Sequence, residues 1–252
     1  MKNGKRKRFT TTDPAALPLP PGAIIGPFTR LDDPMALTLY GAILSPFVRK
    51  IRIQLAEQTI PHEHVIVAPL RQPEWYFDIS PLGRIPAIQD GELKLADSAV
   101  IAQYLQDTYG GASLYGETPA EAARVRWLEK YADYELAPWA TFTVFAQRIL
   151  EPLKGNQTDE QAVARALEEY LPPLLDYLDG ELGGKAFFLG DRMSLADIAV
   201  TSQLINMAHV GELIDEDRWP CLSSLLARMT ARSSLSSLLP AEHQLIAKLN
   251  SR

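Results

Sequence analysis

The sequence predicts a small α/β domain followed by an all-helical domain. Short apolar and β-branched runs alternate with helical patterns up to residue 110, whereas the segment after residue 118 shows helical patterns and no strand pattern. The length of 252 residues accommodates two domains of this kind. We therefore expect the α/β domain over residues 35–110 and the helical domain over residues 119–249, with their boundary in the loop 110–118.

The residues before this pattern differ in composition from the rest. A basic cluster over residues 2–8 is followed by six of the chain's nineteen prolines, all within residues 1–34. Prolines at this density disfavour both helices and central strands, and no apolar signal-peptide segment follows the basic cluster. We predict a disordered extension over residues 1–34, either a solvated tail or a weak interaction tail, and Met35 is an alternative start.

The α/β half predicts the element order β-α-β-α-β-β-α. The elements are expected, in chain order, at strand 36–40, helix 46–57, strand 62–67, short helix 73–77, strands 84–88 and 92–95, and helix 99–109. The first helix follows from the spacing of Phe47, Ile51 and Leu55, which share one helical face. Asp90-Gly91 between two apolar runs indicates a hairpin, and Gly110-Gly111 ends the last helix.

The second half predicts five helices. They are expected at residues 119–150, 159–182, 194–209, 219–229 and 240–249. Pro138 should kink the first, and Pro172-Pro173 should disturb the second. Ser194 and Asp197 have the spacing of a capping box at the start of the third.

Composition excludes several classes of function. The net charge of −6 gives no reason to expect nucleic-acid binding, and no apolar run is long enough to cross a bilayer. Cys221 is the single cysteine, so an internal disulfide cannot form and a reducing, cytoplasmic location fits best. His62 and His64 have no metal-ligand partners nearby, so no metal is expected.

The motif SPFVRK at residues 45–50 is the most informative one. Ser45 occupies an N-cap position and Pro46 the first turn of a helix that directly follows a strand. This placement puts a hydroxyl at the positive end of a helix dipole, where anions and thiolates are stabilised. From these residues alone, a simple helix cap is the favoured interpretation of Ser45.

Three further motifs occur with it in a fixed order. They are SPLGRIPAI at residues 80–88, LADSAVIAQYL at 95–105 and GDRMSLADIA at 190–199. Together with SPFVRK they resemble the cytosolic glutathione transferase superfamily over about residues 36–240. The resemblance implies a thioredoxin-like domain joined to a helical domain. It also implies a serine-type member, similar to the theta, zeta or tau classes or to bacterial members.

The resemblance also implies a glutathione site. Ser45 matches the serine whose hydroxyl hydrogen-bonds the glutathione sulfur and favours its thiolate. Ile85 precedes a cis proline, Pro86, and would pair its main chain with the cysteinyl part, while Asp97 would accept from the γ-glutamyl ammonium. Ser98 would cap its helix and face the γ-glutamyl carboxylate.

Other residues complete the implied glutathione site or compete for a place in it. Phe47 and Arg84 are assigned to the site, Arg84 ahead of Arg71 and Gln72 as the partner of the glycine carboxylate. Tyr40 ends the first strand and is the alternative hydroxyl donor. Because residues 45–48 contain no cysteine, the cysteine-type classes and thioredoxin-like redox chemistry are disfavoured.

The expected activity is conjugation of the glutathione thiolate to a small hydrophobic electrophile. The partners implied are glutathione, the electrophile and a second copy of the chain in a homodimer. A non-catalytic glutathione-binding or regulatory protein, and a glutathione-dependent isomerase or dehalogenase, are the alternatives. The electrophile itself is not predicted, but its pocket could be formed by Leu44 and part of an aromatic series that comprises Tyr131, Tyr134, Trp139, Phe142 and Phe145.

Overall fold

Four short strands form one mixed sheet in the computed structural model, which describes residues 37–69 and 71–251. The strands are β1 (Thr38–Tyr40), β2 (Glu63–Val65), β3 (Ala87–Asp90) and β4 (Leu93–Ala96). Their order is β2-β1-β3-β4; β1 and β2 are parallel and the other pairs antiparallel. The hairpin predicted at Asp90-Gly91 joins β3 and β4. The predicted extension and its alternative start at Met35 lie outside the described residues.

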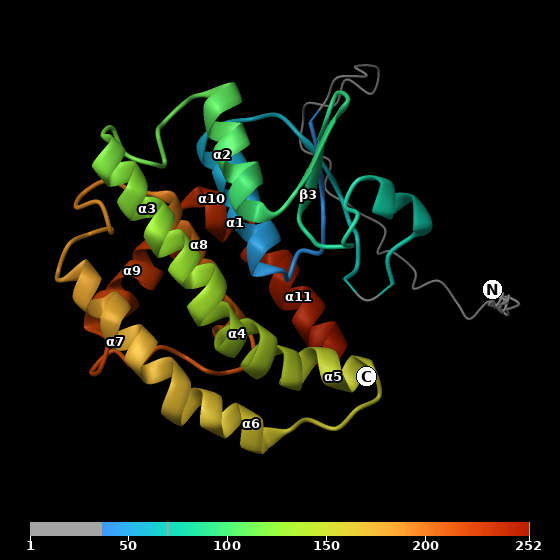
Figure 1. The fold of residues 1–252 in the computed structure, drawn as a ribbon. Coiled ribbons are helices and arrows are strands. Elements are labelled where there is room, and N and C mark those ends of the chain that lie inside the picture. The colour runs from blue at the N-terminus through green and yellow to red at the C-terminus, as the bar shows by residue number, and fades with distance from the viewer. Residues whose placement is uncertain (1–36, 70, 252) are drawn as a thin grey trace, which may run out of the picture. The chain divides into compact units, whose positions relative to one another are not determined.

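Helices cover both faces of this sheet (Figure 1). On one face lie α1 (Pro46–Glu57) and α2 (Ser98–Tyr109), whose apolar residues share a core with Leu39 and Ile88. On the other face lies a short 3-10 helix, η1 (Glu74–Asp78), which buries Tyr76 in a separate cluster. The predicted order β-α-β-α-β-β-α is confirmed, and so is the thioredoxin-like first half.

The remainder of the described chain is helical apart from two isolated bridges near residue 190. Its elements are α3 (Pro119–Tyr131), η2 (Ala132–Leu136), α4 (Ala137–Trp139), η3 (Ala140–Leu150), α5 (Glu151–Leu153), α6 (Glu160–Arg165), η4 (Ala166–Tyr170), α7 (Leu171–Leu182), α8 (Leu195–Ala208), α9 (Pro220–Thr230), α10 (Ser233–Ser236) and α11 (Leu239–Asn250). The segments η2, η3 and η4 have π-helical hydrogen bonding. They lie next to Pro138 and Pro172, where the sequence predicted disturbed helices. The short helix α10 was not predicted.

Helix α8 is the centre of the helical half and lies against α1 of the sheet half (Figure 1). Thirteen of its fourteen residues are buried. Its start is held by Asp197, whose carboxylate accepts from the Ser194 amide at 2.8 Å, the Ser194 hydroxyl at 2.7 Å and the Phe188 amide at 2.9 Å. The predicted capping box is therefore present, and a buried carboxylate closes it.

Replacing Asp197 by asparagine should lower the free energy of unfolding by about 2 kcal/mol, because one of the two acceptor oxygens becomes a donor that faces other donors. Urea unfolding at neutral pH measures the loss. The same substitution at Asp159, the exposed N-cap of α6, is the matched control. Asparagine caps a helix about as well as aspartate, so that change should stay below about 0.5 kcal/mol. Equal losses at both positions would contradict the role of the buried box.

Candidate functional site

The register of the sheet brings the three predicted segments to one edge. Tyr40 of β1 pairs with Ala87 of β3, and Ala87 pairs with Ala96 of β4, so these residues form one row across the sheet. We call this row the site edge. The chain passes from Tyr40 toward Ser45, reaches Ala87 from Ile85 and Pro86, and passes from Ala96 into Asp97 and Ser98. Because β1 and β4 end at this row and β3 begins there, all three segments leave the sheet on the same side.

Gly41 permits close contact between two of these segments. A Cβ atom at Gly41 would lie 2.4 Å from Cγ2 of Val48 in α1 and 3.4 Å from Cβ of Ile85. The main chain after β1 therefore runs directly between the start of α1 and the Ile85 loop, where no side chain fits. The Ile85–Pro86 bond is cis, as the resemblance implied.

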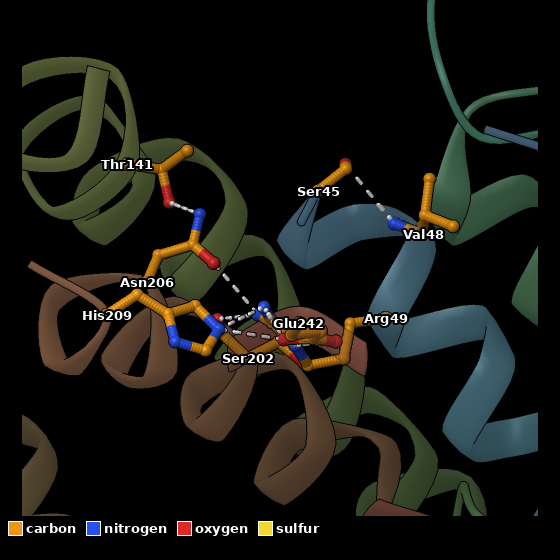
Figure 2. A network of polar contacts seen from close by, with 8 residues as sticks. All are labelled: Ser45, Val48, Arg49, Thr141, Ser202, Asn206, His209 and Glu242. Atoms are coloured by element: carbon orange, nitrogen blue, oxygen red, sulfur yellow. Dashed lines mark hydrogen bonds and ion pairs between the residues drawn. The ribbon is translucent and has the colours of Figure 1, made fainter. Parts of the chain in front are cut away.

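Ser45 is the N-cap of α1, as the sequence predicted. Its Oγ accepts from the main-chain amide of Val48 at 3.4 Å (Figure 2). A hydroxyl has two lone pairs and one proton, and this bond uses a lone pair. The proton of Ser45 therefore stays free to donate, so the capping role and the proposed donor role are compatible.

The cap of α2 is Asp97, and the prediction that Ser98 caps this helix is wrong. Oδ1 of Asp97 accepts from the amides of Ala99 at 2.9 Å and Val100 at 3.3 Å, whereas Ser98 is the first helical residue and is 5% exposed. Aspartate and serine are both good N-cap residues, and here the Asp97 carboxylate accepts from the first free amides of the helix. Asp97 has a φ of +96°, which is rare for a residue other than glycine. Strained backbone of this kind clusters at functional sites.

The structure places Arg84 in the loop before Pro86 and Phe47 in the first turn of α1. The Arg84 side chain is exposed, while its carbonyl accepts from the hydroxyls of Tyr76 at 2.7 Å and Ser80 at 2.8 Å, which fix the loop. Phe47, in the first turn of α1, stacks on Phe142 of η3 with 5.9 Å between ring centroids. Phe142 is 59% exposed, so this pair presents an aromatic surface next to Ser45.

Tyr40, the alternative donor, packs on the other face of the sheet. Its ring lies 5.9 Å from that of Trp75 and 6.2 Å from that of Tyr76, in the cluster opposite α1. Burial also raises the pKa of the Tyr40 hydroxyl. A hydrogen bond with Thr38 lowers this pKa and the charge of Glu63 raises it, but burial has the largest effect. The geometry therefore favours Ser45 as the donor at the site edge.

The aromatic series proposed for the electrophile pocket divides into separate environments. Trp139 stacks on Tyr170 with 3.8 Å between ring centroids, and the Tyr131 ring is tilted against that of Tyr177 at 4.7 Å, both within the helical half. Phe145 is buried with Leu44, Ile149 and Ile246. Leu44 directly precedes Ser45, so this apolar cluster anchors the segment that leads into Ser45. Phe142 is the member that contacts Phe47.

Two site residues were not predicted, and both belong to the SPFVRK motif. Arg49 and Lys50 are fully buried. Nζ of Lys50 donates to Oε1 of Glu129 at 2.8 Å and to Oδ2 of Asp133 at 2.7 Å. Burial alone would lower the pKa of Lys50, but the two carboxylates outweigh it and raise that pKa. Lys50 therefore ties α1 to α3 and η2 of the helical half.

Arg49 ties the same helix to α8 and α11. Its guanidinium bonds both carboxylate oxygens of Glu242, the carbonyl of Ser202 and Oδ1 of Asn206 (Figure 2). The sequence signal for these roles is weak, because a basic pair on a helix is usually solvated. One feature of the predicted fold does point to burial of this pair. A helix that packs on a sheet on one side and on a second domain on the other has little solvated surface.

The remaining candidates have local roles. His62 and His64 contact the carbonyls of Ile60 and Gly41, and Gln72 donates to the carbonyl of Gly83. Within residues 37–69 and 71–251, no cluster of three or more histidine, cysteine or acidic side chains could hold a metal ion. None of the helices in the same ranges is both long and apolar enough to pass through a bilayer.

Comparison with protein families matches both halves of the chain. The model for the glutathione S-transferase N-terminal domain matches residues 39–113, and the model for the C-terminal domain matches residues 160–228. A glutathione S-transferase from Hyoscyamus muticus is 31% identical over 210 residues, covering 80% of this chain and 97% of the relative. Glutathione S-transferase F10 from Arabidopsis thaliana is also 31% identical, covering 80% of this chain and 99% of the relative.

Solved structures share the fold. A glutathione S-transferase from Rhodospirillum rubrum superposes with a TM-score of 0.75 at 26% identity, covering 81% of this chain and 91% of the other. Glutathione transferase F7 from Populus trichocarpa has a TM-score of 0.73 at 23% identity, covering 81% of this chain and 98% of the other. With matched domains in both halves and relatives of nearly the full length, the chain belongs to the glutathione S-transferase family.

Proposed function

We propose that this protein binds glutathione along the site edge and conjugates its thiolate to a small hydrophobic electrophile. The observation that carries the proposal is the sheet register. The chain leaves this edge toward Ser45, Ile85 and the start of α2, which supports a glutathione site formed by these three segments. Membership of the glutathione S-transferase family supports the same activity.

The chemistry begins with the thiol of glutathione. A free thiol has a pKa of about 8.5, so little of it is thiolate at neutral pH. The Ser45 proton and the positive end of α1 favour the anion and lower that pKa. The sulfur lone pair then forms a bond to the electrophilic carbon. With a haloaromatic substrate the halide leaves with its bonding electrons, and the thiol proton passes to solvent. Ser45 stabilises the nucleophile and forms no covalent bond.

The rest of the peptide has complementary groups at the same edge. Ile85 precedes Ala87, the first paired residue of β3, so its main chain can pair with the cysteinyl part beside Pro86. Ser98 at the N-terminus of α2 suits the γ-glutamyl carboxylate. Oδ2 of Asp97 has no hydrogen-bond partner among the described residues, and it suits the ammonium group. The exposed Arg84 suits the glycine carboxylate.

The electrophile would enter on the aromatic side of Ser45. The cluster around Leu44 is buried, whereas the stacked rings of Phe47 and Phe142 are accessible from solvent. This arrangement suits flat, apolar substrates. The proposal includes a serine-type, cytoplasmic enzyme that acts as a homodimer, as members of this family commonly do.

Conjugation of a chloronitroaromatic to glutathione, followed by the absorbance of the product, tests the activity. Phe142→Ala should raise KM for this electrophile about fivefold, because one aromatic stack contributes about 1 kcal/mol. KM for glutathione should stay unchanged. Tyr134→Ala is the matched control, since Tyr134 is exposed on the same long helical segment and contacts Lys130 instead.

A panel of isothiocyanates, hydroperoxides and maleylacetoacetate-like substrates separates the other functions. Retention on glutathione resin without turnover of any of these substrates would contradict the transferase and indicate a binding or regulatory protein. Turnover restricted to isomerisation or dehalogenation would assign the protein to that reaction.

A further inference from the structure

The guanidinium group of Arg49 is fixed by an unusually complete set of contacts. Nε lies 3.1 and 3.0 Å from the two carboxylate oxygens of Glu242, and Nη2 lies 2.6 Å from Oε2. Nη1 donates to the carbonyl of Ser202 at 2.7 Å and to Oδ1 of Asn206 at 2.9 Å. We call these four residues the Arg49 network; Figure 2 shows them between α1, α8 and α11. Arg49, Asn206 and Glu242 are all 0% exposed.

The main chain of Arg49 connects this network to Ser45. Its amide donates to the carbonyl of Ser45 at 2.9 Å, which is the first intrahelical bond of α1. The residue that closes the turn beneath the Ser45 hydroxyl therefore has its side chain locked into the helical half. The first turn of α1 cannot rotate or slide without breaking contacts to α8 and α11.

The network also reaches the electrophile side of the site. Nδ2 of Asn206 donates to Oγ1 of Thr141 at 3.3 Å, and that hydroxyl donates to Oε1 of Gln203 at 2.6 Å. Thr141 directly precedes Phe142, which stacks on Phe47. One buried set of hydrogen bonds thus joins the turn that carries the proposed thiolate donor to the helix that carries the aromatic surface.

We propose that Arg49 is a positioning residue for the conjugation reaction. Through Glu242 and Asn206 it sets the first turn of α1, and hence the Ser45 hydroxyl, against the helix that carries Phe142. This inference rests on the function proposed above. Only a planar guanidinium, with donors pointing in several fixed directions, can reach all three acceptor groups at once. A lysine keeps the positive charge but not this geometry.

The test is Arg49→Lys, because it removes the geometry and retains the charge. The readout is the pKa of enzyme-bound glutathione, followed by the ultraviolet absorbance of the thiolate against pH, together with the pH profile of kcat/KM. We expect the variant to raise this pKa by about one unit and to lower kcat/KM about tenfold near neutral pH. The rate should recover at high pH, where the thiol ionises without help.

The matched control is Arg232→Lys. Arg232 forms a similar two-pronged pair with Glu57, with 2.8 and 2.7 Å contacts, but at the opposite end of α1. The Arg232→Lys variant should lower the melting temperature of the protein without changing the pKa of enzyme-bound glutathione. Equal shifts in both variants would show general loosening of the helix and would overturn the proposal.

A second variant keeps the proposal testable if Arg49→Lys does not fold. Asn206→Ala removes one anchor without changing the net charge and should shift the thiolate pKa in the same direction by a smaller amount. If the wild type forms the thiolate and the folded variants retain its pKa, the positioning role is wrong and the proposed function stands. If the wild type itself forms no thiolate, the proposed function fails first.

Discussion

Replacing Ser45 by alanine should lower kcat/KM for conjugation about 100-fold near neutral pH, the usual effect of removing one preorganised donor from a developing or bound anion. The alanine variant loses the proton that can face the sulfur. It also loses the lone pair that accepts from the Val48 amide. The second loss should lower stability by only about 1 kcal/mol, so the variant should fold. Steady-state conjugation of a chloronitroaromatic, with unfolding followed in parallel, separates the two effects.

The pH dependence of the Ser45→Ala variant identifies the mechanism. If the hydroxyl acts by favouring the thiolate, the defect should shrink as the pH rises past about 8.5, the pKa of a free thiol. Ser45→Thr retains a hydroxyl and a helix cap, so it should keep most of the activity. An undiminished rate in Ser45→Ala would show that the assignment is wrong. A loss in Tyr40→Phe of the same size would then point to the alternative donor.

Local signals in the sequence predict the elements that meet at the site edge, whereas the grouping of Ile85, Pro86 and Asp97 with Ser45 follows from the resemblance to the glutathione transferase superfamily. Ser45-Pro46 is a helix start and Asp90-Gly91 is a hairpin turn, and the order of elements then brings the motifs together. The cap of α2 could not be assigned in the same way. Asp97 and Ser98 are adjacent and both cap helices well. In the structure Asp97 is the residue just before the first helical turn, and its φ of +96° is a local conformation that capping preferences alone do not predict.

The roles of Arg49 and Lys50 could not be predicted because their partners are distant in sequence. Arg49 and Glu242 are 193 positions apart. Periodicity places both on helices but does not show which faces meet. A buried charge is rare unless it is paired, so a basic pair on a helix is ordinarily expected to be solvated. Arg49 and Lys50 are buried instead because α1 is enclosed between the sheet and the helical half.

The aromatic surface was only partly predictable for a geometric reason. The series from Tyr131 to Phe145 crosses π-helical turns in η2 and η3. Each such turn holds an extra residue and rotates the following side chains relative to an ideal α-helix. Spacing of 3.6 residues therefore cannot tell which member faces the first domain. The structure selects Phe142, while Phe145 is 3% exposed in the core.

Replacing Glu242 by alanine should lower the free energy of unfolding by about 3–5 kcal/mol at neutral pH. The substitution leaves the Arg49 guanidinium buried at 0% exposure with its anionic partner gone. Urea unfolding at neutral pH measures the loss. Glu57→Ala is the matched control, because it breaks a more exposed interdomain pair with Arg232 and should cost about 1 kcal/mol.

The same pair should make the protein sensitive to acid. Nε2 of His209 lies 2.8 Å from Oε2 of Glu242. Burial alone would raise the pKa of Glu242, but the charge of Arg49 and this contact with His209 outweigh it, so this pKa lies below its usual value. The folded state therefore holds the Glu242 proton less tightly than the unfolded state. The contribution of Glu242 to the free energy of unfolding is complete above the ordinary glutamate pKa of about 4.3. It is lost as the pH falls through the lower pKa that Glu242 has in the folded state. Glu242→Ala should lack this part of the acid dependence.

A double variant separates the charge from the packing. Arg49→Met with Glu242→Leu removes both charges and fills the space, so it should recover part of the stability that Glu242→Ala loses. The carbonyl of Ser202 and the amide of Asn206 would remain without their donor, which limits the recovery. If the double variant is no more stable than Glu242→Ala, the unpaired guanidinium is not the source of the loss. A stable double variant with poor conjugation would instead show that the buried pair serves the geometry at Ser45 more than the stability of the fold.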